Sequence, residues 1–278
     1  MESNTVTEPT KIIRPKGYTL HEYFSKTWKY RHLVWTFVVQ EMKVQYVQTR
    51  LNFLWLPLRP LILLGIFTLF FDKLIHLQGI NYPYPLFAFT GLLVWNNFNF
   101  MVNNAGNVIL PNQQVIKKMY FPKIILVLSK TLIGIAEQTV SLFLLLLLMI
   151  LLHEPFRFQI IFVPVFLFVG ILIGLSGAIL LNTLSIHHRD LYQLTPTIIG
   201  VLIWFTPVFY PVSLIPKAYL FFIYFNPVAG IIQGCRWAIL GDAFPDLFFL
   251  PAILFVLVLL FVSILIFIRA EEDFADYI

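Results

Sequence analysis

The chain has 278 residues, of which 59% are hydrophobic and only 12% are charged, whereas a soluble domain carries about 25% charged residues. This composition, with a mean hydropathy of +0.83, excludes a soluble globular domain and indicates a polytopic membrane protein. We therefore assign the net charge of +5 to positive cytoplasmic loops, and expect no nucleic-acid partner.

The N-terminal region is predicted to contain a cytoplasmic tail, residues 1–27, followed by an amphipathic helix in the membrane interface, residues 28–52. Five apolar side chains repeat at i, i+3, i+4, i+7 and i+11 and form one stripe along this helix: Trp35, Val38, Val39, Met42 and Tyr46. Two compatible interpretations remain open. The stripe either enters the headgroup region of the membrane or packs on the protein's own helix bundle.

An all-α transmembrane domain of six helices is predicted over residues 53–268, since each span needs about 20 apolar residues. The spans are expected at residues 53–71, 86–110, 124–152, 160–181, 195–210 and 247–268. Before the last span, residues 212–246 are apolar but interrupted by proline and glycine, which predicts two short re-entrant helices on the outer side. Residues 269–278 are expected to form a cytoplasmic tail.

A basic loop at residues 111–123 joins the second and third spans and contains Lys117, Lys118 and Lys123. Counted over six spans, 13 Lys and Arg side chains lie inside and four lie outside, so both termini are expected in the cytoplasm. A second cytoplasmic loop is expected at residues 182–196. The basic loop also offers a compact surface for a soluble partner.

Several polar residues are predicted to lie within the spans. The second span carries a stripe of asparagines: Asn96, Asn99, Asn103 and Asn107. Amides inside a membrane bond neighbouring helices or line a hydrated path, and both interpretations remain open. In the third span, Lys130 is expected to reach the inner interface. Glu137 lies deeper and is a functional candidate by default, either neutral or bonded to another helix.

The sequence lacks several catalytic motifs that are common in enzymes. It contains no GxxxxGK[ST] phosphate loop, no HExxH and no GxSxG, so ATP hydrolysis by the phosphate-loop route is excluded. Cys235 is the only cysteine and the histidines follow no metal spacing. We therefore expect no catalytic residue, no metal and no cofactor bound by this chain, which leaves transport or scaffolding.

Several motifs, taken in their order along the chain, resemble those of a known family. The motifs are MKVQYVQTRLNFLW, NQQVIKKMYFPK, HHRDLYQLTP, WFTPVFYPVSLIP, YFNPVAGIIQGCRWAILG and the final FADYI. From about residue 28 onward, the chain resembles the membrane subunit of bacterial polysaccharide ABC exporters. These type-two ABC export permeases move lipid-linked O-antigen, capsule or teichoic acid polymers. Asn52 departs from the pattern, since the family commonly has glycine there.

The resemblance implies a homodimeric permease, in the bacterial inner membrane, that serves lipopolysaccharide biosynthesis. Two copies of a cytoplasmic ATPase subunit would bind ATP and Mg, and the substrate would be a lipid-linked polysaccharide, above all O-antigen. The residues implied to contact the ATPase are Lys43, Arg50, Pro111, Asn112, Gln113, Gln114, Lys117, Lys118, Pro122, Arg189 and Asp190. The residues implied to line a channel at the homodimer interface are Trp95, Asn96, Phe98, Asn99, Phe100, Asn103, Trp204, Phe205 and Tyr210.

Two other transport functions remain as alternatives. One is an exporter of a drug or small lipid with the same fold, which would need fewer aromatic residues along its path. The other is a proton-coupled secondary transporter with Glu137 as the proton carrier; inverted repeats would favour it. A membrane glycosyltransferase is disfavoured because the sequence lacks the acidic catalytic residues.

Overall fold

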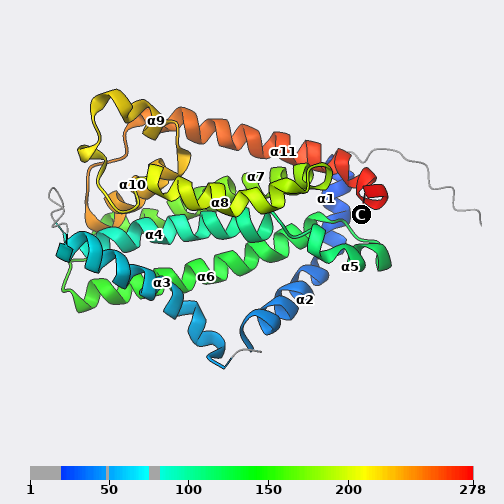
Figure 1. Cartoon of the computed structure of the whole chain (residues 1–278), viewed down its shortest axis with the longest axis horizontal. Coiled ribbons are helices and arrows are strands. Elements are labelled where there is room, and N and C mark those ends of the chain that lie inside the picture. Colours follow the sequence, from blue (N-terminus) through cyan, green and yellow to red (C-terminus); the bar gives the residue numbers. More distant parts are fainter. Residues whose placement is uncertain (1–19, 48–49, 75–81, 278) are drawn as a thin grey trace, which may run out of the picture.

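A computed structural model describes residues 20–47, 50–74 and 82–277, and this part of the chain is helical with no strand (Figure 1). Most of the predicted N-terminal tail and part of the first outer loop lie outside the described residues. The main helices are α1 Leu20–Lys29, α2 Arg31–Met42, α3 Trp55–Phe67, α4 Tyr84–Phe100, α5 Gln113–Lys118, α6 Ile124–Leu151, α7 Val163–His187, α8 Asp190–Phe205, α9 Leu220–Tyr224, α10 Pro227–Leu240 and α11 Leu250–Tyr277.

Four segments of the described chain are long and apolar enough to cross a membrane, and the bent pair formed by α9 and α10 raises the number to five. The four segments are Asn52–Phe71, Ile124–Leu151, Phe158–His187 and Leu247–Glu271. They coincide with four of the six predicted spans. The other two predicted spans correspond to α4, with 17 residues, and α8, with 16 residues.

The central helix of the bundle is α4, which contacts α3, α6, α7 and α10. Nearly every side chain from Leu86 to Trp95 is buried, so α4 packs against protein on all sides, as a helix that is apolar all round does. Close contact with α7 depends on Gly174, because a Cβ atom there would lie 2.7 Å from the Cβ of Met101. Gly170 and Gly174 have the GxxxG spacing that is typical of close helix packing. The contact is tight at Gly174, whereas at Gly170 the nearest atom to a Cβ is 3.5 Å away.

The cytoplasmic end of the second predicted span differs from the prediction. The helix continues past Phe100 only as a π-helical turn, Met101–Ala105, rather than to Leu110. Such a turn inserts one residue into the helical register. As a result, the seven- and eleven-residue spacings that place Asn103 and Asn107 on one face with Asn96 no longer hold.

The predicted interface helix corresponds mainly to α2, which continues as a π-helical segment, Lys43–Val47. The separate helix α1 lies mostly within the predicted tail and ends before Tyr30. Side chains of the predicted apolar stripe pack on the bundle, where Val38 forms a cluster with Phe100 of α4 and Ile133 of α6. The exception is Trp35, which is 66% exposed.

The second cytoplasmic loop is much shorter than the predicted 182–196, because α7 extends to His187 and α8 begins at Asp190. Two of the polar residues that indicated a loop, Asn182 and Thr183, lie in α7 and form hydrogen bonds there. Asn182 donates to the carbonyls of Ala178, at 2.9 Å, and Ala105, at 2.6 Å. Similarly, α11 continues to Tyr277, so that residues 269–277 extend a helix.

The segment predicted to be re-entrant forms the two helices α9 and α10, which are bent by 97°. Local chemistry sets the limits of α10. The Asn226 side chain accepts a hydrogen bond from the backbone N–H of Val228 and Pro227 occupies the first turn, both typical of a helix start. Gly241 ends the helix in the left-handed region at φ 73°, which glycine adopts without strain.

Candidate functional site

An aromatic cleft with a volume of 770 Å³ opens between α4, α7, α8, α9 and α11. Its wall is built almost entirely from apolar side chains, among them eight aromatic ones: Trp95, Phe98, Trp204, Phe205, Tyr210, Tyr219, Phe222 and Phe225. The first five belong to the predicted channel set, so the fold brings together residues from positions 95–98 and 204–210. Trp204 is 57% exposed and Phe205 is 66% exposed, which leaves their rings available to a ligand.

The turn that follows α8, residues 206–210, is fixed by three side chains from other elements. The Tyr84 hydroxyl donates to the carbonyl of Phe209 at 3.1 Å, and the Asn226 amide donates to the hydroxyl of Thr206 at 2.9 Å. Arg236 donates to the carbonyls of Pro207, at 2.8 Å, and Val208, at 2.6 Å. The turn thereby holds Tyr210 and the end of α8 at the cleft.

Arg236 is one of the four Lys and Arg side chains that the topology prediction counts as outer charges, yet it is only 3% exposed. Its guanidinium lies 3.5 Å from the centre of the Phe87 ring, a cation–π contact that is strong when water is excluded. Its approach to the turn requires Gly91, since a Cβ atom there would lie 2.7 Å from the carbonyl oxygen of Val208. Arg236 is thus an internal clamp on the cleft.

A second, polar cavity of 240 Å³ lies between α3, α4 and α6. Its polar lining comprises Tyr46, Arg59, Asn96, Asn97, Asn99, Asn104, Glu137, Gln138 and Ser141. The predicted channel residues Asn96, Asn99 and Phe100 border this cavity rather than the aromatic cleft. Asn103 lines neither cavity and donates to the side chain of Asn99 at 2.6 Å. The predicted set is therefore divided between two sites.

Of the two interpretations considered from the sequence, bonding to a neighbouring helix is seen at Asn97, whereas Asn96 and Asn99 border the polar cavity. Asn97 donates to the carbonyl of Gly134 on α6 at 3.1 Å, a bond between helices. Asn107 donates to the carbonyl of Asn103, one turn earlier, at 3.1 Å. In the part of the chain that the structure describes, the side-chain oxygens of Asn97, Asn103 and Asn107 are buried and accept no hydrogen bond.

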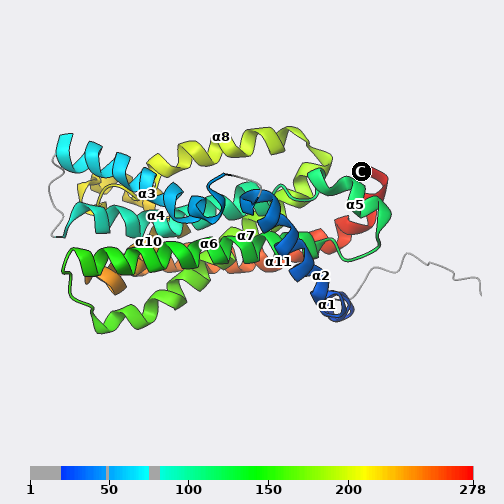
Figure 2. The same cartoon turned by 90° about the horizontal axis from the view of Figure 1, so that it is seen from below.

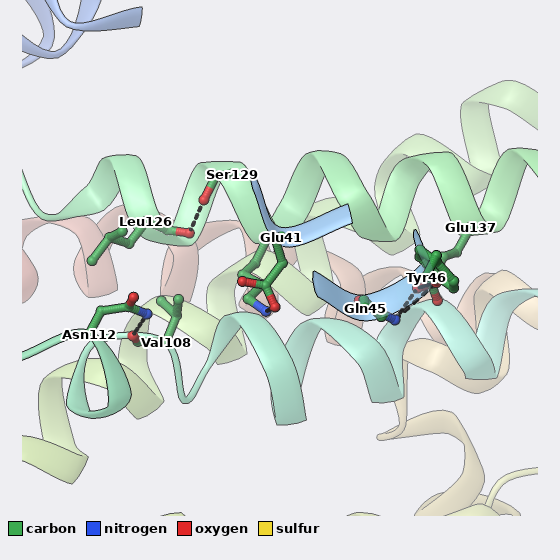
Figure 3. A network of polar contacts seen from close by, with 9 residues as sticks. Glu41, Gln45, Tyr46, Val108, Asn112, Leu126, Ser129 and Glu137 are labelled. Atoms are coloured by element: carbon green, nitrogen blue, oxygen red, sulfur yellow. Dashed lines mark hydrogen bonds and ion pairs between the residues drawn. The ribbon is translucent and has the colours of Figure 1, made fainter. Parts of the chain in front are cut away.

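Glu137 borders the polar cavity and is bonded to the segment that follows α2 (Figure 3). Its Oε1 accepts from the Tyr46 hydroxyl at 2.5 Å and from the Gln45 amide at 3.2 Å. Nearer the start of α6, Lys130 pairs with Glu41 of α2 at 2.5 Å. The interpretation that Glu137 bonds another helical segment is confirmed, and Lys130 has a protein partner.

The predicted coupling residues are found in two places. Gln114, Lys117 and Lys118 are exposed on α5, and Arg189 and Asp190 are exposed at the start of α8. In Figures 1 and 2, α5 and the start of α8 lie at the same end of the bundle.

The other coupling residues lie apart from this group. Lys43 and Arg50, both exposed, lie beyond the far end of α2, close to the start of α3. Pro111, Asn112 and Gln113 precede or begin α5, whereas Pro122 is buried. Only part of the predicted coupling set is therefore available at one surface.

Glu271 anchors the end of the basic loop and was not singled out in the sequence. It accepts hydrogen bonds from the Tyr23 hydroxyl and from the backbone N–H of Lys123, the latter at 3.0 Å. Lys123 Nζ lies 3.4 Å from the same carboxylate. A carboxylate is stabilised at the N-terminus of a helix, here that of α6. Burial, together with Glu271, raises the pKa of Tyr23 above its ordinary value.

An all-helical chain with several apolar spans and a large open cleft among them is a multi-pass membrane protein of the transporter class. A family model described as ABC-2 type transporter matches residues 32–240, which is 209 of 278 residues, and the chain belongs to this family. It is a membrane permease subunit, and the ATPase resides on a separate partner subunit. Because the partner ATPase supplies the energy for transport, the alternative of a proton-coupled secondary transporter is set aside.

Three curated relatives show what the chain is similar to. It is 26% identical over 221 residues to the O-antigen export system permease protein RfbA of Myxococcus xanthus, covering 79% of this chain and 84% of that protein. It is 26% identical over 198 residues to RfbA of Klebsiella pneumoniae, covering 71% and 76%. Its identity to the polysialic acid transport protein KpsM of Escherichia coli is 24% over 208 residues, covering 73% and 79%.

Proposed function

We propose that this chain is the permease of an ATP-driven exporter that moves a lipid-linked polysaccharide of the O-antigen class across the bacterial inner membrane. The observation that carries the proposal is the aromatic cleft with its exposed Trp204 and Phe205 rings. Sugar rings present C–H faces that stack on aromatic side chains, while amides serve their hydroxyl groups. The relatives named for O-antigen and polysialic acid transport support the same class of substrate.

The transporting unit is a homodimer with a channel at the interface between its two copies. This assignment is supported by α3 and α8, which lie on the same side of the bundle, away from α6 and α11 (Figure 2). Both helices carry exposed apolar side chains: Leu61, Ile62, Ile66, Leu194, Ile198 and Val201. A second copy covers part of this face and encloses the aromatic clefts. Six spans per copy, with both termini in the cytoplasm, complete the proposed arrangement.

Two copies of the ATPase subunit dock at the cytoplasmic end, where they bind ATP and Mg. The exposed side chains of α5, Gln114, Lys117 and Lys118, form the main contact, together with Arg189 and Asp190 at the start of α8. Lys43 and Arg50 transmit the movement toward α3. At the outer end, α9 and α10 act as re-entrant helices that cap the channel. The channel runs past both the aromatic cleft and the asparagines of α4.

The test is purification of the chain with its ATPase, followed by reconstitution into inverted vesicles with a lipid-linked oligosaccharide. We expect equal amounts of the two subunits and ATP-dependent uptake of the oligosaccharide. Replacement of Lys117 and Lys118 by Glu is expected to release the ATPase, whereas the same change at Lys217, an exposed residue of the outer segment, is expected to leave it bound. Export of polysaccharide by a chain free of ATPase would refute the proposal.

The almost wholly apolar wall of the cleft favours one alternative, an exporter of a small lipid or drug with the same fold. Fluorescence distinguishes the two, because Trp95 and Trp204 both line the cleft. Under the main proposal, an oligosaccharide quenches or shifts their emission, and Trp204→Phe weakens the response. A response to short-chain lipids alone would favour the alternative.

A further inference from the structure

We propose that Glu137 is a positioning residue that links the segment after α2 to the asparagine-lined cavity, so that movement of this segment changes access to the cavity. The inference rests on the proposed function in one respect, that the ATPase moves the interface helix. Glu137 contacts no substrate in this proposal. Glu137 acts on the position of α6, and α6 acts in turn on α4.

The first link is the junction between the segment Lys43–Val47 and Glu137 (Figure 3). The Tyr46 side chain is only 1% exposed and its ring stacks on Phe53, just before α3, with centroids 5.8 Å apart. Both Tyr46 and Gln45 donate to the same carboxylate oxygen of Glu137. Two donors from one short segment thus meet on a single oxygen of α6, so this junction holds the segment to α6.

The second link runs from Glu137 to α4. Gly134 lies one turn before Glu137 on α6, and its carbonyl accepts the hydrogen bond from Asn97. Tyr46, Glu137, Gly134 and Asn97 all line the polar cavity. A displacement of α6 at Glu137 therefore acts directly on the bond that holds Asn97. The side-chain oxygen of Asn97 is buried and accepts no hydrogen bond among the described residues. The same displacement of α6 changes the surroundings of this oxygen.

The conformation of the segment favours such a role. Residues 43–47 form a π-helical segment, a geometry less regular than the α-helix and frequent at functional sites. The segment lies between α2 and the turn that leads to α3, so a movement of α2 reaches it first. The ion pair between Lys130 and Glu41 also joins α2 to α6, but neither residue lines the cavity, so it provides an internal control.

Three variants of the chain, each purified with its ATPase, test the inference. Tyr46→Phe removes only the hydroxyl and keeps the ring on Phe53, Glu137→Gln removes the charge, and Glu41→Gln breaks the control ion pair. The first readout is ATP hydrolysed per oligosaccharide exported. We expect this ratio to rise about tenfold in Tyr46→Phe and Glu137→Gln, the scale of one lost charge-assisted bond, and to stay within about twofold in Glu41→Gln.

The second readout does not depend on the substrate. Asn104 is exposed and lines the cavity, and the one native cysteine, Cys235, is buried. The new thiol of an Asn104→Cys variant is therefore labelled selectively by a small thiol reagent. We expect its labelling rate to change when a non-hydrolysable ATP analogue binds the complex, and expect Tyr46→Phe and Glu137→Gln to abolish that change.

The possible results distinguish the role of Glu137 from the proposed substrate. Nucleotide-dependent labelling that persists in both variants, or that is lost equally in Glu41→Gln, overturns the role of Glu137. Normal labelling behaviour in a complex that exports no oligosaccharide refutes the proposed substrate and leaves the role of Glu137 supported. If Glu137→Gln fails to assemble, Tyr46→Phe decides, because it leaves the ring packing in place.

Discussion

Replacing Arg236 by methionine is expected to loosen the outer half of the bundle. The substitution removes two hydrogen bonds, at 2.8 and 2.6 Å, from the carbonyls of Pro207 and Val208. Each buried carbonyl left without a donor costs ~1–3 kcal/mol, and the lost contact with the Phe87 ring adds ~2 kcal/mol. The substitution also removes the cost of burying a charged guanidinium, and this gain offsets several kcal/mol of the loss. The net loss expected is about 3 kcal/mol, or roughly 100-fold in the population of open states.

The assay uses Cys235, the only cysteine of the chain and a fully buried neighbour of Arg236. A maleimide reacts with this thiol only when α10 opens, so its labelling rate in detergent reports the open population. The rate is expected to rise roughly 100-fold in Arg236→Met and to remain near wild type in Lys217→Met, an exposed residue of the same outer segment. A labelling rate within twofold of wild type for Arg236→Met would refute the role of Arg236 in holding the turn after α8.

Trp204→Ala is expected to reduce oligosaccharide export several-fold and to lower the free energy of unfolding by ~1–3 kcal/mol, because the half-exposed ring also contacts Phe67 and Phe209; export and thermal unfolding measure the two effects. Glu271→Gln breaks the pairing with Lys123 and is expected to destabilise the chain by ~1–3 kcal/mol, with faster proteolysis of the basic loop. Gly174→Val drives a side chain into Met101 and is expected to cost ~1–3 kcal/mol, whereas Gly170→Ala has room and is expected to unfold at the wild-type temperature.

The sequence was sufficient to predict an all-helical membrane protein and the positions of most long helices. Apolar length alone locates α6 and α11, and the chemistry around Asn226 and Gly241 predicts the broken outer segment. Membrane helices are predictable because their backbone must be satisfied internally, which makes hydropathy a direct signal. The loop before Asp190 was predicted too long, because polar residues such as Asn182 form their hydrogen bonds within the bundle.

The candidate sites were predictable only in part. The asparagine spacing on α4 assumes regular α-helical geometry, and the π-helical turn at Met101–Ala105 has no signature in a single sequence. Arg236 was assigned to the outside because charge counting treats every cation as solvated. The partner of Glu137 is Tyr46, 91 residues away. No periodicity connects the two residues, so their contact becomes visible only in three dimensions.

The division of the predicted channel residues has a physical consequence for transport. Under the proposed function, a polymer that passes Trp204 would meet exposed aromatic rings, which bind sugar faces without fixing the positions of hydroxyl groups, and this favours sliding over tight binding. At Asn96 and Asn99 it meets amides, whose directional hydrogen bonds discriminate between hydroxyl arrangements. Selection by the sugar sequence is therefore expected beside the cavity that Glu137 borders, where movement of the interface segment acts, and the aromatic cleft is expected to tolerate different polymers. Exchange of the α4 asparagines for serine should accordingly change substrate preference, whereas exchange of the cleft aromatics should change the export rate for all substrates alike.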